Sequence, residues 1–217
     1  MLNNIHAAIF DLDGTLIDSM WVWEKIDVDY LTAKGFKMPE DLRDDIAHLS
    51  FQDTAIYFKN RFKLKESIDE IREEWNAMAL NEYKYNVKLK PGAEEFLKLL
   101  KRNGIKIALA TSNCSPILDI ALESNAMGKY FDIIVTTYEA DRGKDFPDIY
   151  LLAAEKLAVK PENCIVFEDI LPAVLSAKEA GMKVVGVMDK AAAHQHEEIR
   201  NCANMTIENY IELCSML

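Results

Sequence analysis

Two aspartates near the start of the chain are placed where a catalyst could use them. Asp11 lies near the end of the apolar run Ala7–Leu12, and Asp13 follows directly after that run. A carboxylate can attack phosphorus, and a second one beside it can give a proton to the leaving oxygen and later take one from water. An Asp-x-Asp pair alone is more often part of a turn. The chemistry therefore depends on which other functional residues accompany the pair.

Hydroxyl groups follow a second apolar run, Ile105–Ala110. Thr111 and Ser112 come directly after it, and hydroxyls and backbone N–H groups that precede a helix can bind phosphate oxygens. The alternative is that Ser112 or Asn113 only caps the helix that follows. We predict that Thr111 and Ser112 bind phosphate, and we keep N-capping as the alternative.

Two acids and a lysine complete the set. Glu168 and Asp169 follow an apolar run that starts at Cys164. Adjacent carboxylates are hard oxygen ligands suited to Mg²⁺, although solvated loop acids are the simpler alternative. A carboxylate that attacks a phosphate dianion meets a repulsion on the order of several kcal/mol at an effective dielectric of about 20. We expect Mg²⁺, bound by Asp11 and Asp169, and the ammonium of Lys144 to neutralise it.

The elements that would position these residues alternate between strands and helices. The predicted strands are Ala7–Leu12, Ile105–Ala110, Ile133–Thr137, Ile165–Glu168 and Lys183–Val187. This alternation predicts an α/β fold with a doubly wound parallel sheet. Ligands of such sheets bind at the carboxyl ends of the strands. The aspartates, hydroxyls, acids and lysine should therefore meet at one edge of the sheet.

The interval between the first two strands is too long for a simple crossover. Residues 18–88 contain several helical patterns and no strand pattern, so they predict an inserted helical subdomain. The expected organisation is a core of 1–17 plus 89–217 and a helical cap of 18–88. One cap helix should start at Ser67, which forms a capping box with Glu70.

Composition narrows the class of protein further. The 217 residues are 50% hydrophobic and carry a formal charge of −11, which argues against nucleic-acid or anionic membrane partners because the protein's field repels polyanions. The sequence shows no targeting or membrane-spanning pattern, so we expect a cytoplasmic protein. The four cysteines have no metal-ligand spacing, and we expect reduced thiols with Cys164 in the core. No protein partner is implied.

The candidate residues together resemble the haloacid dehalogenase-like phosphatase superfamily, in the group of β-phosphoglucomutase and phosphoglycolate phosphatase. The resemblance covers essentially the whole chain. Its four motifs correspond in order to Asp11-Leu12-Asp13-Gly14-Thr15, Thr111, Lys144 and Glu168-Asp169. The first motif is highly specific, and the others stand in the expected strand context.

The resemblance implies a Rossmann-like core with a helical cap inserted after the first motif. It implies that Asp11 is the nucleophile and a Mg²⁺ ligand, and that Asp13 is the general acid and base and offers its backbone carbonyl to the metal. Asp169, with Glu168, would complete the metal site. Thr111 and Lys144 would bind the phosphate.

The sequence departs from the family pattern at several positions. Asp145 replaces a proline beside Lys144, and Ile170 and Ala173 replace the usual serine and glycine after the acidic pair. Neither change removes a catalytic group. Both could alter how these loops pack.

The cap lacks two residues that handle a sugar phosphate in the mutases. Trp23 and Phe51 stand near the positions of the mutases' histidine and arginine, which favours a phosphatase over a mutase. Trp23 and Phe51 are possible substrate contacts, with packing in the cap core as the alternative.

Three functions remain open at this stage. The first is a phosphatase for a small phosphorylated metabolite, such as a sugar phosphate or a nucleoside monophosphate. The second is a phosphosugar mutase. The third is a receiver-like regulator that stores phosphate on an aspartate; the long helical insertion and Asp13 argue against it.

Overall fold

The structure is a computed structural model that describes residues 4–46, 51–113 and 115–214. The chain divides into two compact units, Met1–Ser19 with Val87–Leu217 and Met20–Asn86. The chain leaves the first unit after Ser19 and re-enters it at Val87. The first unit holds all the motif residues of the predicted core.

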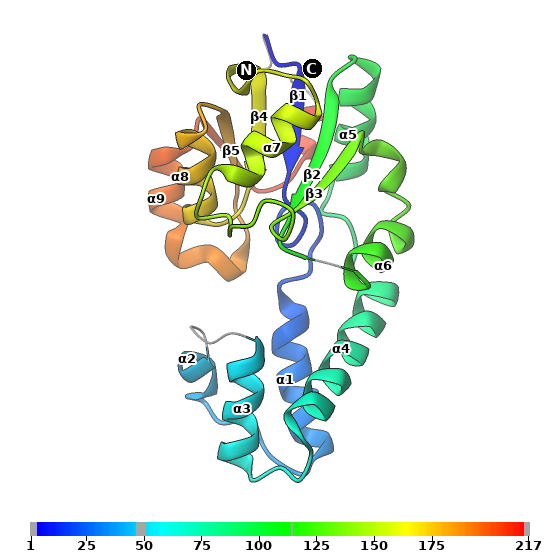
Figure 1. Ribbon diagram of the computed structural model, residues 1–217, viewed down its shortest axis with the longest axis vertical. Coiled ribbons are helices and arrows are strands. Elements are labelled where there is room, and N and C mark those ends of the chain that lie inside the picture. Colours follow the sequence, from blue (N-terminus) through cyan, green and yellow to red (C-terminus); the bar gives the residue numbers. More distant parts are fainter. Residues whose placement is uncertain (1–3, 47–50, 114, 215–217) are drawn as a thin grey trace. The chain divides into compact units, whose positions relative to one another are not determined.

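A parallel sheet forms the centre of the first unit (Figure 1). Within the described residues it has six strands in the order β3-β2-β1-β4-β5-β6, and all neighbouring strands run parallel. The strands are β1 (Ala7–Phe10), β2 (Lys106–Thr111), β3 (Ile133–Thr136), β4 (Cys164–Glu168), β5 (Lys183–Val187) and β6 (Met205–Ile207). The prediction of a doubly wound parallel sheet is confirmed. The strand β6 was not predicted.

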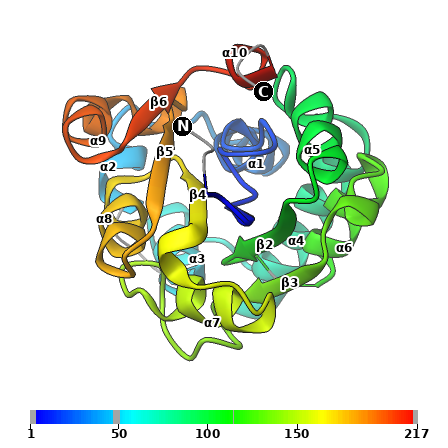
Figure 2. The same ribbon diagram turned by 90° about the horizontal axis from the view of Figure 1, so that it is seen from above.

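Helices cover both faces of this sheet, as Figure 2 shows. The α-helices of the unit are α5 (Ala93–Arg102), α6 (Ile117–Ser124), α7 (Asp148–Lys156), α8 (Leu171–Glu179), α9 (His196–Cys202) and α10 (Ile211–Cys214). Short 3₁₀ helices are η1 (Gly128–Tyr130), η2 (Pro161–Asn163) and η3 (Lys190–Gln195). Helices α7, α8 and α9 lie on one side of the sheet, and α5 and α6 lie on the other.

Both faces of the central strands are buried, because parallel strands in such a fold are covered on each side. On one face, a hydrophobic cluster joins Ala7 and Ile9 to Val166, Ala153 and Val174. This cluster links strands β1 and β4 to helices α7 and α8. The predicted core cysteine Cys164 belongs to the same cluster and is fully buried; Cys114 lies outside the described residues.

Aromatic rings pack on the opposite face of the sheet, around the last residue of β1. Phe10 and Phe167 stack with ring centroids 4.4 Å apart, and Phe96 stacks on Tyr210 at 5.6 Å. The Tyr210 hydroxyl donates to the backbone carbonyl of Thr15 at 3.3 Å. The aromatic cluster thus supports the loop that follows β1.

The second unit consists of helices in its described part. They are α1 (Trp21–Ala33), α2 (Leu42–Ile46), α3 (Phe51–Phe62) and α4 (Ile68–Tyr85). The capping box is confirmed, since the Ser67 hydroxyl accepts the Glu70 N–H at 3.2 Å and the Glu70 carboxylate accepts the Ser67 N–H at 2.7 Å. Tyr30, Phe58 and Trp75 form its aromatic core. None of the described helices in either unit is long and apolar enough to span a membrane.

Candidate active site

The first motif lies where the chain order of the sheet reverses. Strand β1 pairs with β2 on one side and with β4 on the other, and such a switch point leaves a crevice at the carboxyl ends of the strands. Asp11 follows β1 directly, and its N–H donates to the carbonyl of Phe167 at 3.1 Å. The Asp11 carboxylate is therefore held at the edge of the sheet where ligands bind.

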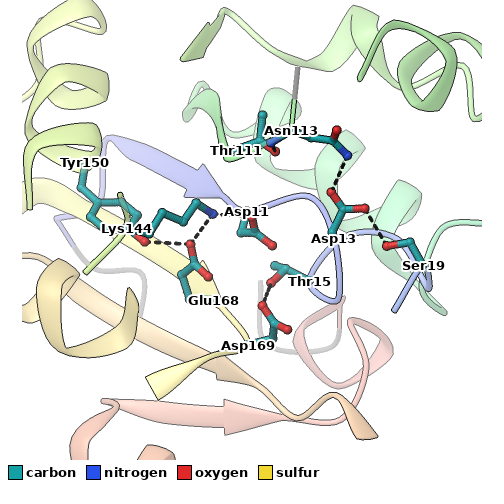
Figure 3. A network of polar contacts seen from close by, with 10 residues as sticks. All are labelled: Asp11, Asp13, Thr15, Ser19, Thr111, Asn113, Lys144, Tyr150, Glu168 and Asp169. Atoms are coloured by element: carbon teal, nitrogen blue, oxygen red, sulfur yellow. Dashed lines mark hydrogen bonds and ion pairs between the residues drawn. The ribbon is translucent and has the colours of Figure 1, made fainter. Parts of the chain in front are cut away.

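A buried polar network surrounds Asp11 (Figure 3). The Lys144 ammonium donates to the Asp11 carboxylate and, at 2.7 Å, to Glu168 Oε1. The Tyr150 hydroxyl donates to the same Glu168 oxygen at 2.7 Å. Each of these side chains is less than a tenth exposed. Strand ends β1 and β4 and the segment before α7 thus meet around one ammonium group.

Tyr150 is a site residue that the sequence reasoning missed. It lies in the first turn of α7, and its ring is fully buried. A buried phenol needs a hydrogen-bonding partner. That rule could have marked Tyr150 as a polar residue of the core, but it could not have named Glu168 as the partner.

The crowding of carboxylates changes their acidity. Burial raises the pKa of Asp11 to about 7; Lys144 opposes the rise, and the charges of Glu168 and Asp13 add to it. Burial also raises the pKa of Asp169 well above its ordinary value, and the Asp11 and Glu168 charges act in the same direction. Burial alone would lower the pKa of Lys144, but the two carboxylates that it contacts outweigh burial and raise it.

The residues present suit a divalent cation. Ligand oxygens of Asp11, Glu168 and Asp169 lie within 4.8 Å of one another, and all three residues are buried. Within the described residues, Lys144 is the cation that contacts this group, through Asp11 and Glu168. Glu168 Oε2 is buried and has no hydrogen-bonding partner among the described residues. Three gathered carboxylates and a buried oxygen without a partner are features that suit a Mg²⁺ ion.

The Asp13 carboxylate has hydrogen-bond partners of its own. Its two oxygens accept hydrogen bonds from the Ser19 hydroxyl at 2.7 Å and from the Asn113 amide at 2.9 Å (Figure 3). Gly14 beside it has φ +81°, a conformation that favours glycine, and its N–H donates to the Ile17 carbonyl. The turn therefore fixes the position of the Asp13 side chain. Ser19 and Asn113 were not predicted as its partners.

Thr111 is the last residue of β2, and Ser112 follows it in a loop ahead of the next helix. Thr111 is buried and its hydroxyl accepts the Asn113 N–H at 3.0 Å, whereas Ser112 is exposed. Helix α6 begins at Ile117 with Pro116 as its N-cap. The alternative that Ser112 or Asn113 caps this helix is therefore wrong. The helix starts later because the chain first forms a turn closed by Thr111, and proline is tolerated at a helix start.

The two aromatic residues proposed as cap contacts belong to the second unit. The rings of Trp23 and Phe51 pack edge to face with centroids 5.5 Å apart, and Phe51 makes a similar contact with Trp75 at 5.7 Å. Trp23 is 37% exposed. Both residues thus extend the aromatic packing of the unit, and their contact with a substrate stays a prediction.

The residues that depart from the motif pattern leave the network intact. Asp145 is exposed, while the neighbouring Lys144 points into the buried cluster. Ala173 is fully buried in the hydrophobic core. Ile170 is the N-cap residue of α8 but offers no side-chain hydrogen bond.

Comparison with known proteins identifies the family. The sequence family described as "Haloacid dehalogenase-like hydrolase" matches residues 8–187, which is most of the chain. The chain belongs to the haloacid dehalogenase-like hydrolases. The resemblance drawn from the four motifs is confirmed, and the fold matches the Rossmann-like core of this family.

Relatives in the family are named as phosphatases. The chain is 31% identical over 185 residues to a phosphorylated carbohydrates phosphatase of Thermotoga maritima, and the match covers 85% of this chain and 86% of that protein. It is 27% identical over 211 residues to hexitol phosphatase B of Escherichia coli O157:H7, covering 96% and 94% of the two chains.

A solved structure shares the whole fold. It is a Thermotoga maritima protein assigned provisionally as a β-phosphoglucomutase. The TM-score is 0.85 at 28% identity, and 98% of each chain is covered. This haloacid dehalogenase-like hydrolase therefore resembles both named phosphatases and a mutase-like protein.

Proposed function

We propose that this hydrolase is a Mg²⁺-dependent phosphatase that cleaves a small phosphate monoester through an aspartyl-phosphate on Asp11. The observation that carries the proposal is the buried contact of the Asp11 carboxylate with the Lys144 ammonium at the carboxyl end of β1. A nucleophile and a cation for the phosphate group meet there. The reaction class, phosphoric monoester hydrolysis, is that of the named relatives.

The metal would be held by Asp11, Glu168 and Asp169, with the backbone carbonyl of Asp13 as a further ligand. Bound Mg²⁺ would offset the negative charge that a phosphate group brings to this acidic cluster. The ammonium of Lys144 adds a second positive charge next to Asp11. Thr111 and Ser112 are the proposed hydrogen-bond donors to phosphate oxygens.

The chain's own residues would carry out two displacement steps. In the first, an Asp11 oxygen forms a bond to phosphorus, the bond from phosphorus to the ester oxygen breaks, and Asp13 protonates that oxygen. In the second, Asp13 takes a proton from water, water attacks phosphorus, and the Asp11 carboxylate is released. The Ser19 and Asn113 hydrogen bonds fix the Asp13 carboxylate for these transfers.

The relatives' names point to a substrate class. One is named for phosphorylated carbohydrates and another for hexitol phosphates. We therefore place sugar and sugar-alcohol phosphates first and nucleoside monophosphates second. Family membership among hydrolases gives no support to the receiver-like alternative.

The test is phosphate release from a panel of phosphorylated metabolites, with and without Mg²⁺. The panel holds sugar 6-phosphates, hexitol phosphates, β-glucose 1-phosphate, phosphoglycolate and nucleoside monophosphates, and Asp11→Asn is the blank. Mg²⁺-dependent release from a few members, absent in Asp11→Asn, is expected. Equal release by Asp11→Asn would contradict the assignment of the nucleophile.

A phosphosugar mutase is the second candidate, because a structure with a TM-score of 0.85 carries the provisional β-phosphoglucomutase assignment. A mutase would convert β-glucose 1-phosphate to glucose 6-phosphate without releasing phosphate. Coupled detection of glucose 6-phosphate in the same panel separates the two. Phosphate release without the isomer supports the phosphatase.

A further inference from the structure

Helix α8 begins directly after the acidic pair and lacks a capping side chain of its own. Its N-cap residue is Ile170, whose side chain cannot accept a hydrogen bond. Since Pro172 has no N–H, the first-turn donors that have no acceptor inside the helix are those of Leu171 and Ala173. The next N–H, that of Val174, already donates to the Ile170 carbonyl. Serine, threonine, aspartate or asparagine would ordinarily serve at the N-cap position.

A side chain from a segment distant in the sequence caps the helix instead. The Gln195 side-chain oxygen accepts the Leu171 N–H at 2.7 Å. The amide nitrogen of Gln195 faces the His194 ring at 3.0 Å, which agrees with the oxygen being the atom that faces Leu171. The contact joins residues 24 positions apart in the sequence, so it is a tertiary contact and not a local cap.

The segment that carries Gln195 is itself anchored. Gln195 ends η3, and Asp189 at the start of η3 accepts the Ala191 N–H at 2.9 Å. The other oxygen of Asp189 pairs with the buried ammonium of Lys90 at 2.6 Å. The His196 ring contacts the Asp189 carbonyl at 2.8 Å. These contacts hold both ends of η3, the segment that presents Gln195.

Asp169 lies immediately before the N-cap residue of α8. Asp169 is separated from Leu171 only by Ile170, and its carboxylate accepts the Thr15 hydroxyl at 3.2 Å. We propose that Gln195 is a positioning residue for Asp169: by capping α8, it keeps the Asp169 carboxylate in the acidic cluster with Asp11 and Glu168. The inference rests on the metal role proposed above for Asp169.

The experiment measures Mg²⁺ binding by calorimetry without substrate, alongside phosphate release as a function of Mg²⁺ concentration. Partners that orient a metal ligand typically contribute 10- to 100-fold in affinity. We expect Gln195→Ala to weaken Mg²⁺ binding by about tenfold, while kcat at saturating Mg²⁺ stays close to that of the wild type. Gln195→Glu should bind Mg²⁺ nearly as well as the wild type, because a carboxylate oxygen accepts the same hydrogen bond and suits a helix N-terminus.

A compensating substitution gives a sharper version of the test. Ile170→Ser supplies a local N-cap hydroxyl, so the double variant Ile170→Ser, Gln195→Ala should regain much of the lost Mg²⁺ affinity. The matched control is Ser67→Ala, which removes the cap of α4 in the other unit. It should lower the melting temperature by an amount similar to Gln195→Ala and leave Mg²⁺ affinity unchanged.

The outcomes separate this inference from the proposed function. If the wild type binds no Mg²⁺, the metal role of the acidic cluster is wrong, and the positioning role of Gln195 is overturned with it. If the wild type binds Mg²⁺ and Gln195→Ala binds it equally well, only the positioning role is overturned. A lower melting temperature with unchanged Mg²⁺ affinity would likewise reduce Gln195 to a structural cap.

Discussion

Removing one hydroxyl tests how the buried network is held together. Tyr150→Phe deletes the donor to Glu168 Oε1 at 2.7 Å and leaves the ring, so no cavity is formed. Both side chains are almost completely buried, at 0% and 1% exposure. Water cannot replace the lost donor. Glu168 Oε1 then keeps the Lys144 ammonium as a hydrogen-bond donor, and Glu168 Oε2 has no partner among the described residues.

The size of the effect follows from the charge of the acceptor and from burial. A hydrogen bond to a charged group contributes about 1.5 to 3 kcal/mol, so we expect Tyr150→Phe to lower the free energy of unfolding by about 2 kcal/mol. For a chain of this length that corresponds to a melting temperature lower by roughly 4 to 8 °C. Burial, with the charge of Glu168, raises the pKa of Tyr150 well above its ordinary value. The phenol therefore stays a donor throughout the pH range of the assay.

The assay is equilibrium urea unfolding in EDTA, which removes any contribution from bound metal. The control is Tyr130→Phe, because the Tyr130 hydroxyl donates to Glu94 Oε1 at a similar 2.8 Å but the Glu94 side chain is 37% exposed. Water can hydrate Glu94, so this variant should lose less than about 1 kcal/mol. Equal losses of unfolding free energy in the two variants would show that burial of the acceptor does not strengthen the hydrogen bond.

Three further predictions concern the metal, the core and pH. Chelation by EDTA should abolish phosphate release and added Mg²⁺ should restore it; full activity in excess EDTA would contradict the metal role. Gly186→Ala places a methyl group 2.4 Å from Ile199 Cγ2. The substitution should lower the free energy of unfolding in urea by about 1 to 3 kcal/mol. An unchanged urea midpoint would show that the sheet accommodates the methyl group without strain. Burial acts to raise the pKa of Asp132, but hydrogen bonds from Lys101 and the Ile107 N–H outweigh it and hold this pKa below its ordinary value. The ionised Asp132 carboxylate therefore stabilises the fold above its ordinary pKa, and this stability is lost as the pH falls and the carboxylate is protonated. The difference in urea midpoint between the wild type and Asp132→Asn should shrink as the pH falls from about 5 to 3. A difference that does not change with pH would show that the charge of Asp132 does not stabilise the fold.

Much of the fold could be predicted from local patterns in the sequence. The strands β1 and β4 were predictable because buried parallel strands are short continuous apolar runs, and the Ser67 capping box is set by residues three apart. The strand Met205–Ile207 could not be predicted from its three residues, one of them the polar Thr206. Its place as a strand depends on pairing with β5.

The site was predictable only as far as strand ends determine it. Asp11 follows β1 and Glu168 ends the neighbouring parallel strand β4, so their meeting at one edge follows from topology. The hydrogen bonds of Tyr150, Asn113 and Gln195 join segments 18 to 100 residues apart. Such pairs depend on how helices and loops pack, and no local spacing in the sequence marks them.

The decisive step of the proposed mechanism is the transfer of the phosphoryl group to Asp11. The most direct measurement uses the Asp13→Asn variant with p-nitrophenyl phosphate, whose leaving group departs without a proton while hydrolysis of the intermediate lacks its base. We expect a burst of one nitrophenolate per active site, and mass spectrometry after an acid quench should find a phosphoryl group on the peptide that contains Asp11. Steady turnover with no covalent phosphate, or phosphate on another residue, would rule out Asp11 as the nucleophile.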